Sequence, residues 1–160
     1  MEAVGSPSPL DPRRFFAGRW SGQGEFAPHG PARLVLARQP VRLEGRGEWL
    51  GERVWRVHER FALGSGFGFE RQMWLEQVAE GRVHATADDI PLGAEIELFA
   101  DGFRFRRFRS WLPYRGVRFR LGCASESRLG ADGALHAVIR LDFWRLPVAT
   151  LRLTIRIERT

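Results

Sequence analysis

Two stretches near the end of the chain decide the fold: residues 135–144, which read LHAVIRLDFW, and residues 149–158, which read ATLRLTIRIE. In both, apolar and polar side chains alternate with a period of two. This pattern is typical of a β-strand that buries one face and exposes the other. The two stretches therefore predict two β-strands, separated by only a short connection.

The same alternation recurs along the chain, and helical periodicity is almost absent. Val117, Phe119, Leu121 and Cys123 alternate with arginines, and so do Phe103 and Phe105. Further strands are predicted at residues 19–26, 33–37, 41–49, 53–63, 69–78, 82–87 and 94–99. Glycine-containing segments at residues 63–68, 80–81, 100–102, 113–116 and 131–133 are typical of tight turns.

About ten strands joined by tight turns predict an antiparallel meander. A long meander with one apolar face closes most economically into a barrel, because closure removes the sheet edges. We therefore predict an all-β fold, a single closed antiparallel barrel of eight to ten strands, with a two-sheet sandwich as the alternative. Asp11 and Pro12 are suited to begin a short helical turn at residues 11–16. Residues 1–12 are predicted to form a flexible tail, and residues 13–160 the barrel domain.

Composition limits the class of protein. The chain has 160 residues, 44% of them hydrophobic, with six Trp and twelve Phe, which fits one folded domain and excludes a disordered chain. No apolar run approaches the roughly 20 residues of a membrane span. The first residues lack the apolar core of a signal peptide, so we expect a cytoplasmic protein. The one cysteine, Cys123, excludes an internal disulfide framework.

The net charge is +6, and all 25 basic residues are arginine. Residues 103–120 contain seven arginines and no acid: Arg104, Arg106, Arg107, Arg109, Arg115, Arg118 and Arg120. Such a patch is suited to an anionic protein, nucleic acid or lipid surface. Most of these arginines alternate with apolar residues, which favours a solvated outer strand face instead, and no specific nucleic-acid partner is expected.

Two charged residues break the apolar phase of their strands. Glu59 falls in phase with Trp55 and Phe61, and Arg107 falls in phase with Phe105. If both face inward, they are buried charges that need a partner or a ligand. If strand bulges shift the phase, both are exposed.

Signatures of catalysis or of a metal site are few. No serine lies in a G-x-S-x-G motif. Asp88 and Asp89 are adjacent, which fits a strand end and turn better than a pair of catalytic carboxylates. Cys123 falls in phase with the apolar residues Val117, Phe119 and Leu121, and is expected to be a small core residue. The histidines lack metal-ligand spacing. We therefore expect no enzyme activity, no metal and no cofactor.

The opening strand, G-x-W-x-G-x-G at residues 18–24, resembles that of the calycin barrels, which include lipocalins, fatty-acid-binding proteins and nitrobindins. Glu59 with Phe61, Arg71 with Trp74, and the ending at residues 143–148 are similar to nitrobindin-like proteins and to an uncharacterised bacterial lipocalin-like family. The resemblance implies a calycin-type fold. Nitrobindins hold haem through a histidine on the final strand, where this chain has Leu151.

Together, these observations predict a protein that binds a small, mainly apolar ligand inside the barrel, with a carboxylate-bearing ligand as one form. The predicted lining residues are Trp20, Trp55, Glu59, Phe61, Phe105, Arg107, Phe119, Ile139 and Leu151. Glu59 and Arg107 are the expected polar anchors. A nitrobindin-like haem protein and a module that binds an anionic partner through its outer arginines are the alternatives. The sequence leaves open whether the protein is a monomer or a dimer.

Overall fold

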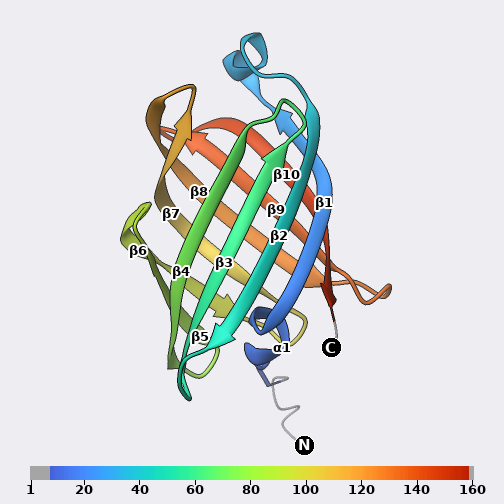
Figure 1. Cartoon of the computed structure of the whole chain (residues 1–160), viewed down its shortest axis with the longest axis vertical. Coiled ribbons are helices and arrows are strands. Elements are labelled where there is room, and N and C mark those ends of the chain that lie inside the picture. Colours follow the sequence, from blue (N-terminus) through green and yellow to red (C-terminus); the bar gives the residue numbers. More distant parts are fainter. Residues whose placement is uncertain (1–7, 159–160) are drawn as a thin grey trace, which may run out of the picture.

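Ten antiparallel strands close into a barrel in the computed structural model, which describes residues 8–158 (Figure 1). Each strand pairs with its neighbours along the chain, and β1 pairs with β10 to close the barrel. The strands are β1 (Gly18–Pro28), β2 (Gln39–Trp49), β3 (Val54–Leu63), β4 (Gly68–Ala79), β5 (Arg82–Ala87), β6 (Ile90–Leu98), β7 (Gly102–Tyr114), β8 (Val117–Leu129), β9 (Leu135–Phe143) and β10 (Leu146–Glu158). The predicted all-β meander barrel is confirmed.

The two stretches that decide the fold form β9 and β10. Their inward residues stand opposite each other, as Leu151 with Ile139 and Ile155 with Leu135. The outward positions of β10 carry exposed arginines, such as Arg152. The period-two pattern therefore gave the buried face of these strands correctly.

The strand predicted at residues 33–37 is wrong. Residues Gly30–Leu34 form a short 3-10 helix, η1, and Leu34 and Val35 are exposed. Local hydrogen bonds replace strand pairing here, since the N–H of Ala32 donates to the carbonyl of His29 at 3.2 Å. Pro31 follows the first residue of η1, where its fixed φ suits a helical start.

A single helical turn, α1 (Arg13–Phe16), covers one end of the barrel (Figure 1). Pro12 has helical dihedral angles, and the carboxylate of Asp11 accepts a hydrogen bond from the N–H of Arg13 at 3.0 Å. The predicted helical turn is confirmed. Phe16 is buried, and its ring centroid lies 4.8 Å from that of Phe103 and 6.1 Å from that of Trp55. We call this end of the barrel the closed end.

The predicted flexible tail lies mostly outside the described residues, which begin at residue 8. Within the described part, Leu10 is buried, and its N–H donates to the carbonyl of Phe99 at 2.9 Å. Packing against the barrel therefore begins before the predicted boundary at residue 13. Whether residues 13–160 fold as a unit without the segment before them stays a prediction.

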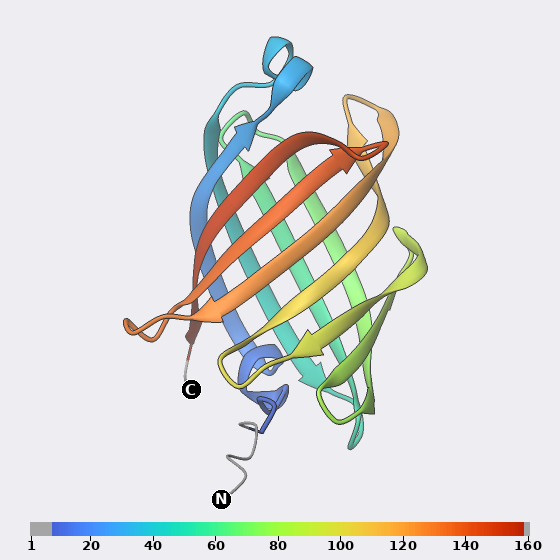
Figure 2. The same cartoon turned by 180° about the vertical axis from the view of Figure 1, so that it is seen from behind.

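The end of the barrel opposite α1 is formed by the tips of several hairpins, and we call it the open end (Figure 2). Because the strands alternate in direction, the β3–β4, β7–β8 and β9–β10 connections all lie there. The rings of Phe67 in the β3–β4 tip and Tyr114 in the β7–β8 hairpin approach with centroids 5.7 Å apart. No helix in the described part of the chain is long and apolar enough to cross a membrane.

Candidate functional site

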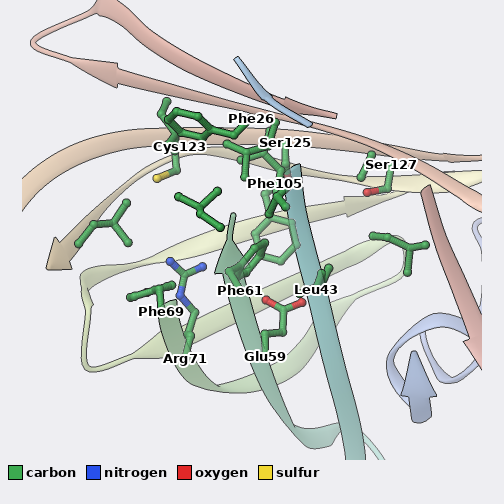
Figure 3. Close-up of a pocket in the computed structure, with 18 of the residues that line it drawn as sticks. Phe26, Leu43, Glu59, Phe61, Phe69, Arg71, Phe105, Cys123, Ser125 and Ser127 are labelled. Atoms are coloured by element: carbon green, nitrogen blue, oxygen red, sulfur yellow. The ribbon is translucent and has the colours of Figure 1, made fainter. Parts of the chain in front are cut away.

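The barrel holds an internal cavity of about 180 Å³ (Figure 3). It extends from Phe67 and Leu112 near the open end to Phe103, which packs against α1. One water needs only ~10–15 Å³, so the cavity has room for a small organic molecule. Because α1 and its aromatic neighbours fill the closed end, access is from the open end.

The wall of the cavity is predominantly apolar. Its hydrophobic lining comes from β1 to β4, the β3–β4 connection, β7, β9 and β10, and consists of Phe26, Val41, Leu43, Phe61, Leu63, Phe67, Phe69, Phe103, Phe105, Phe108, Leu112, Ala137, Ile139, Leu141, Leu151 and Ile155. The polar exceptions are Glu59, Arg71, Ser125 and Ser127, together with the thiol of Cys123. An apolar wall with a few polar groups is the usual composition of a small-molecule site.

Arg71 enters the cavity from β4 and is held by two partners. Its Nε donates to Asp89 at 2.9 Å, and its Nη2 donates to the hydroxyl of Ser110 at 3.1 Å. The Ser110 hydroxyl in turn donates to Asp89 at 2.6 Å. Ser110 is fully buried, and the side chains of Arg71 and Asp89 are only 10% and 17% exposed. This triad neutralises the arginine and fixes the orientation of its guanidinium group.

Asp89 reaches the triad from the turn between β5 and β6. Its backbone carbonyl accepts a hydrogen bond from the N–H of Trp111 at 2.8 Å, which fastens the turn to β7. The prediction that Asp88 and Asp89 lie at a strand end and turn is confirmed, since β5 ends at Ala87 and β6 begins at Ile90. The turn nevertheless brings one of the two carboxylates to an arginine of the cavity wall.

Glu59 stands directly opposite Arg71 in the β3–β4 ladder, and both side chains point into the cavity (Figure 3). The two side chains nevertheless form no ion pair, and the Glu59 carboxyl has no hydrogen-bond partner among residues 8–158. Burial raises the pKa of Glu59 above its ordinary value of 4.5, against the opposing effect of Arg71. A protonated carboxyl is a hydrogen-bond donor, so Glu59 presents a free polar group to whatever fills the cavity.

Cys123 lies in the cavity wall on β8 and is buried. Burial raises the pKa of its thiol to about 11, so the thiol stays protonated at neutral pH. The expectation that Cys123 is a small core residue rather than a nucleophile agrees with this environment.

The structure divides the nine predicted lining residues into four groups. Five of them line the cavity, namely Glu59, Phe61, Phe105, Ile139 and Leu151. Trp20 and Trp55 are buried outside the cavity wall, where their strands approach the closed end. Phe119 is 40% exposed on β8 near the β7–β8 tip, beyond the cavity.

The remaining residue, Arg107, lies on the outside of the barrel, which corrects its assignment as an inward anchor. The pairing of β7 with β8 shifts between Phe105 and Phe108, so one extra residue reverses the phase of the strand. Arg107 forms a bidentate ion pair with Asp142 at 2.6 and 3.1 Å on the outer face. Hydrogen bonds from Arg107 hold the pKa of Asp142 below its usual value.

The inward arginine is instead Arg71, which sequence reasoning noted only as part of a family motif. A signal for it was present, because Arg71 falls in phase with the apolar residues Phe69, Met73 and Leu75 along β4. The same break of apolar phase that singled out Glu59 also singles out Arg71.

The cavity does not fit a haem held by an axial histidine. No histidine is among the residues that line it, and Leu151 occupies the wall at the position that the nitrobindin resemblance assigns to the ligand. His29 instead forms a hydrogen bond with Thr150 at 2.7 Å, and His136 contacts Asp132. No group of three or more potential metal ligands occurs within residues 8–158.

Comparison with solved structures supports the fold class. The chain matches the S-type phycobiliprotein lyase CPES from Guillardia theta with a TM-score of 0.61 over 94% of each chain, at 10% sequence identity. This likeness supports a calycin-type barrel. No protein-family model and no curated protein matches the chain.

The comparison also corrects the expectation of no enzyme activity. The matching structure is named a lyase, so a barrel of this kind is compatible with catalysis and cannot be used to exclude it. The absence of a familiar catalytic motif was therefore an insufficient basis for that expectation.

Proposed function

We propose that the protein binds a small, mainly apolar molecule in the barrel cavity, with the polar group of that molecule held at Glu59 and Arg71. The observation that carries the proposal is the Glu59 carboxyl, which points into a predominantly apolar cavity without a hydrogen-bond partner among the described residues. A carboxyl in mainly apolar surroundings is costly to leave without a protein partner, and a ligand group would satisfy it.

The side chains of Glu59 and Arg71 together favour a ligand with a hydrogen-bond acceptor, such as a carboxylate or a carbonyl group. Asp89 and Ser110 occupy Nε and Nη2 of Arg71, whereas Nη1 has no partner among residues 8–158. Below its raised pKa, the Glu59 carboxyl carries a proton and offers a second donor beside it. Two donors in a mainly apolar cavity suit a ligand that has one acceptor group and is otherwise apolar. A cytoplasmic location remains part of this proposal.

The size of the cavity sets the scale of the ligand. Its volume of about 180 Å³ is below the roughly 300–1,000 Å³ of sites for drug-sized molecules. A ligand with a short apolar body fits this volume without movement of the wall. Burying such a body contributes about 25 cal/mol for each Å² of apolar surface.

A competition assay tests the proposal. Aminoanthracene serves as the fluorescent probe, and decanoic acid, decanol and decylamine compete with it. At a pH below the raised pKa of Glu59, we expect decanoic acid and decanol to displace the probe more effectively than decylamine, because the protonated Glu59 carboxyl and Arg71 then both donate. As the pH rises and Glu59 ionises, the competition by decanoic acid should weaken in the wild type and stay constant in Glu59→Gln.

Filling the cavity provides the site control. Leu151→Trp and Ile139→Phe place a larger side chain in the cavity wall, whereas Leu146→Trp makes a comparable change at a position 68% exposed. The first two should lower probe affinity by at least about tenfold, and the third should not. Unchanged affinity in both folded cavity variants, or no binding in the wild type, would overturn the proposal. Mass spectrometry of the recovered competitors shows whether the protein also alters them.

A further inference from the structure

A second site lies outside the barrel, on the β7–β8 hairpin and the β9–β10 turn. Arginine and aromatic side chains line a surface groove of about 450 Å³ there. We call it the arginine rim and define it by Arg109, Trp111, Arg120, Trp144 and Arg145, with Leu146 beside them in the same turn. The two hairpin tips beside it belong to the open end of the barrel (Figures 1 and 2).

The positive charge of the rim is not neutralised. Arg109, Arg120 and Arg145 have no ion-pair partner among residues 8–158. The one acidic side chain next to the groove, Asp142, is already occupied by both nitrogens of the Arg107 fork. Farther along β7 the pattern differs, because Arg104 and Arg106 pair with glutamates of β6 and β8. The rim therefore presents arginines available to an external anion.

The rim also exposes apolar side chains. Trp144 is 81% exposed, Leu146 68% and Phe143 42%. Trp144 and Arg145 form the two-residue turn with φ of +51° and +67°, a conformation that favours Asn and Gly rather than bulky side chains. The chain thus holds a tryptophan at a hairpin tip despite an unfavourable backbone conformation, which points to a role for that side chain.

We propose that the arginine rim docks the protein on a membrane surface rich in anionic phospholipid. Arginines contact the phosphate and carboxylate groups of the lipids, while Trp144 and Leu146 enter the interface between headgroups and acyl chains. Tryptophan favours this interface because its ring is apolar and its N–H is polar. The aliphatic Leu146 and the 54% exposed Val117 near the second tip favour lipid over nucleic acid, which binds through stacking on aromatic rings.

The experiment measures co-sedimentation of the full chain with vesicles. Vesicles of phosphatidylcholine and phosphatidylserine, about two to one, are compared with vesicles of phosphatidylcholine alone, since anionic lipid attracts each nearby arginine. We expect binding only to the anionic vesicles, and weaker binding at high salt. The triple variant Arg109→Ser, Arg120→Ser and Arg145→Ser should lose roughly a hundredfold in affinity.

A second triple variant removes the same charge elsewhere. Arg42, Arg152 and Arg156 are exposed on β2 and β10, outside the residues that line the groove, and form no ion pair within the described residues. Their replacement by Ser lowers the net charge equally, and the rim mechanism predicts at most a few-fold loss of affinity. Equal losses in the two triple variants would show that net charge alone drives binding and would overturn the proposal.

Trp144→Asn tests whether the tryptophan side chain contributes to membrane binding. The substitution should preserve the fold, because Asn suits a positive φ. We expect at least about a fivefold loss of vesicle binding with unchanged thermal stability. Unchanged binding in this variant would exclude insertion of the tryptophan. If the wild type ignores the vesicles, or binds a mixed-sequence single-stranded oligonucleotide more tightly through the same residues, the membrane assignment is wrong.

Discussion

The two ends of the barrel interior contain similar aromatic residues, but these residues pack together at one end and line a cavity toward the other. At the closed end, Phe16 and Trp49 both pack against Trp55, and the rings of Trp49 and Trp55 stack with centroids 4.6 Å apart. Farther along the same strands, aromatic residues such as Phe61 and Phe69 only line a cavity. Aromatic content alone therefore does not tell a packed barrel from a hollow one.

The difference arises from which strands bring large residues to the same level. Near the closed end, α1 adds Phe15 and Phe16 to the rings supplied by the strands. Gly45 also leaves room for the Trp20 indole, whose Nε1 would collide with a side chain at that position. Near the middle, the inward positions of β8 are the small Cys123, Ser125 and Ser127, and space remains opposite them. The aromatic packing is thus concentrated near the closed end, and the cavity lies farther along the barrel.

The largest expected effect is the removal of a ring from the closed end. Trp55 is completely buried, so Trp55→Ala should lower the free energy of unfolding by about 3–5 kcal/mol in urea denaturation. Ile139→Ala, which shortens a residue at the cavity wall, should cost less, about 1–2 kcal/mol, because that side chain already lacks neighbours on one side.

Trp55→Phe serves as a matched control. The indole N–H of Trp55 is buried without a hydrogen-bond partner among residues 8–158, so replacing it by an apolar ring should cost no more than about 1 kcal/mol. A larger loss for Ile139→Ala than for Trp55→Ala would mean that the two ends of the interior are not packed as the structure shows.

Period-two alternation was sufficient to predict the closed barrel, because each strand with one buried face must join a common core. It failed where local chemistry decides instead. Residues 33–37 have apolar residues at Leu34 and Leu36, yet the hydrogen bonds of η1 satisfy the backbone without pairing. The cavity was predicted only as a possibility, since its volume depends on which side chains meet across the barrel.

A second prediction contrasts the two arginines that sequence reasoning confused. Arg71 is buried with Asp89, so Arg71→Met leaves a carboxylate without its counter-charge and should cost about 3 kcal/mol of stability. Arg107 and its partner lie on the outer face, with the arginine side chain 40% exposed, so Arg107→Met should cost less than about 1 kcal/mol. Thermal or urea denaturation of both variants measures the difference.

Adding Asp89→Asn to Arg71→Met refines the result. Once the arginine is absent, removal of the stranded carboxylate should cost little or recover stability, so the double variant should lose less than the two single variants added together. Additive losses would show that the two side chains do not act as a pair.

The confusion between Arg107 and Arg71 has a physical origin. Apolar residues alternate through Phe103 and Phe105, and the doubled Arg106–Arg107 then precedes Phe108. That doubling marks the bulge, because strict alternation would place Phe at position 107. Asp89, in contrast, enters the polar cluster from a turn, and no periodicity within one strand predicts a contact between a turn and a distant strand.

The smallest expected effect concerns Glu59 itself. Because burial raises its pKa in the folded protein, the folded state holds the proton more tightly than the unfolded chain. The free energy of unfolding should therefore fall as the pH rises from the ordinary value of 4.5 to the raised value, and then stay at the lower level. Glu59→Gln lacks this titration and should be more stable than the wild type above that interval. Below pH 4.5 the free energies of unfolding of the two proteins should converge.

Urea denaturation at a series of pH values measures the stability curves of both proteins. If the wild-type and Glu59→Gln curves run parallel, the Glu59 carboxyl is solvated as in the unfolded chain. The mainly apolar surroundings of Glu59, on which the proposed ligand binding rests, would then not exist.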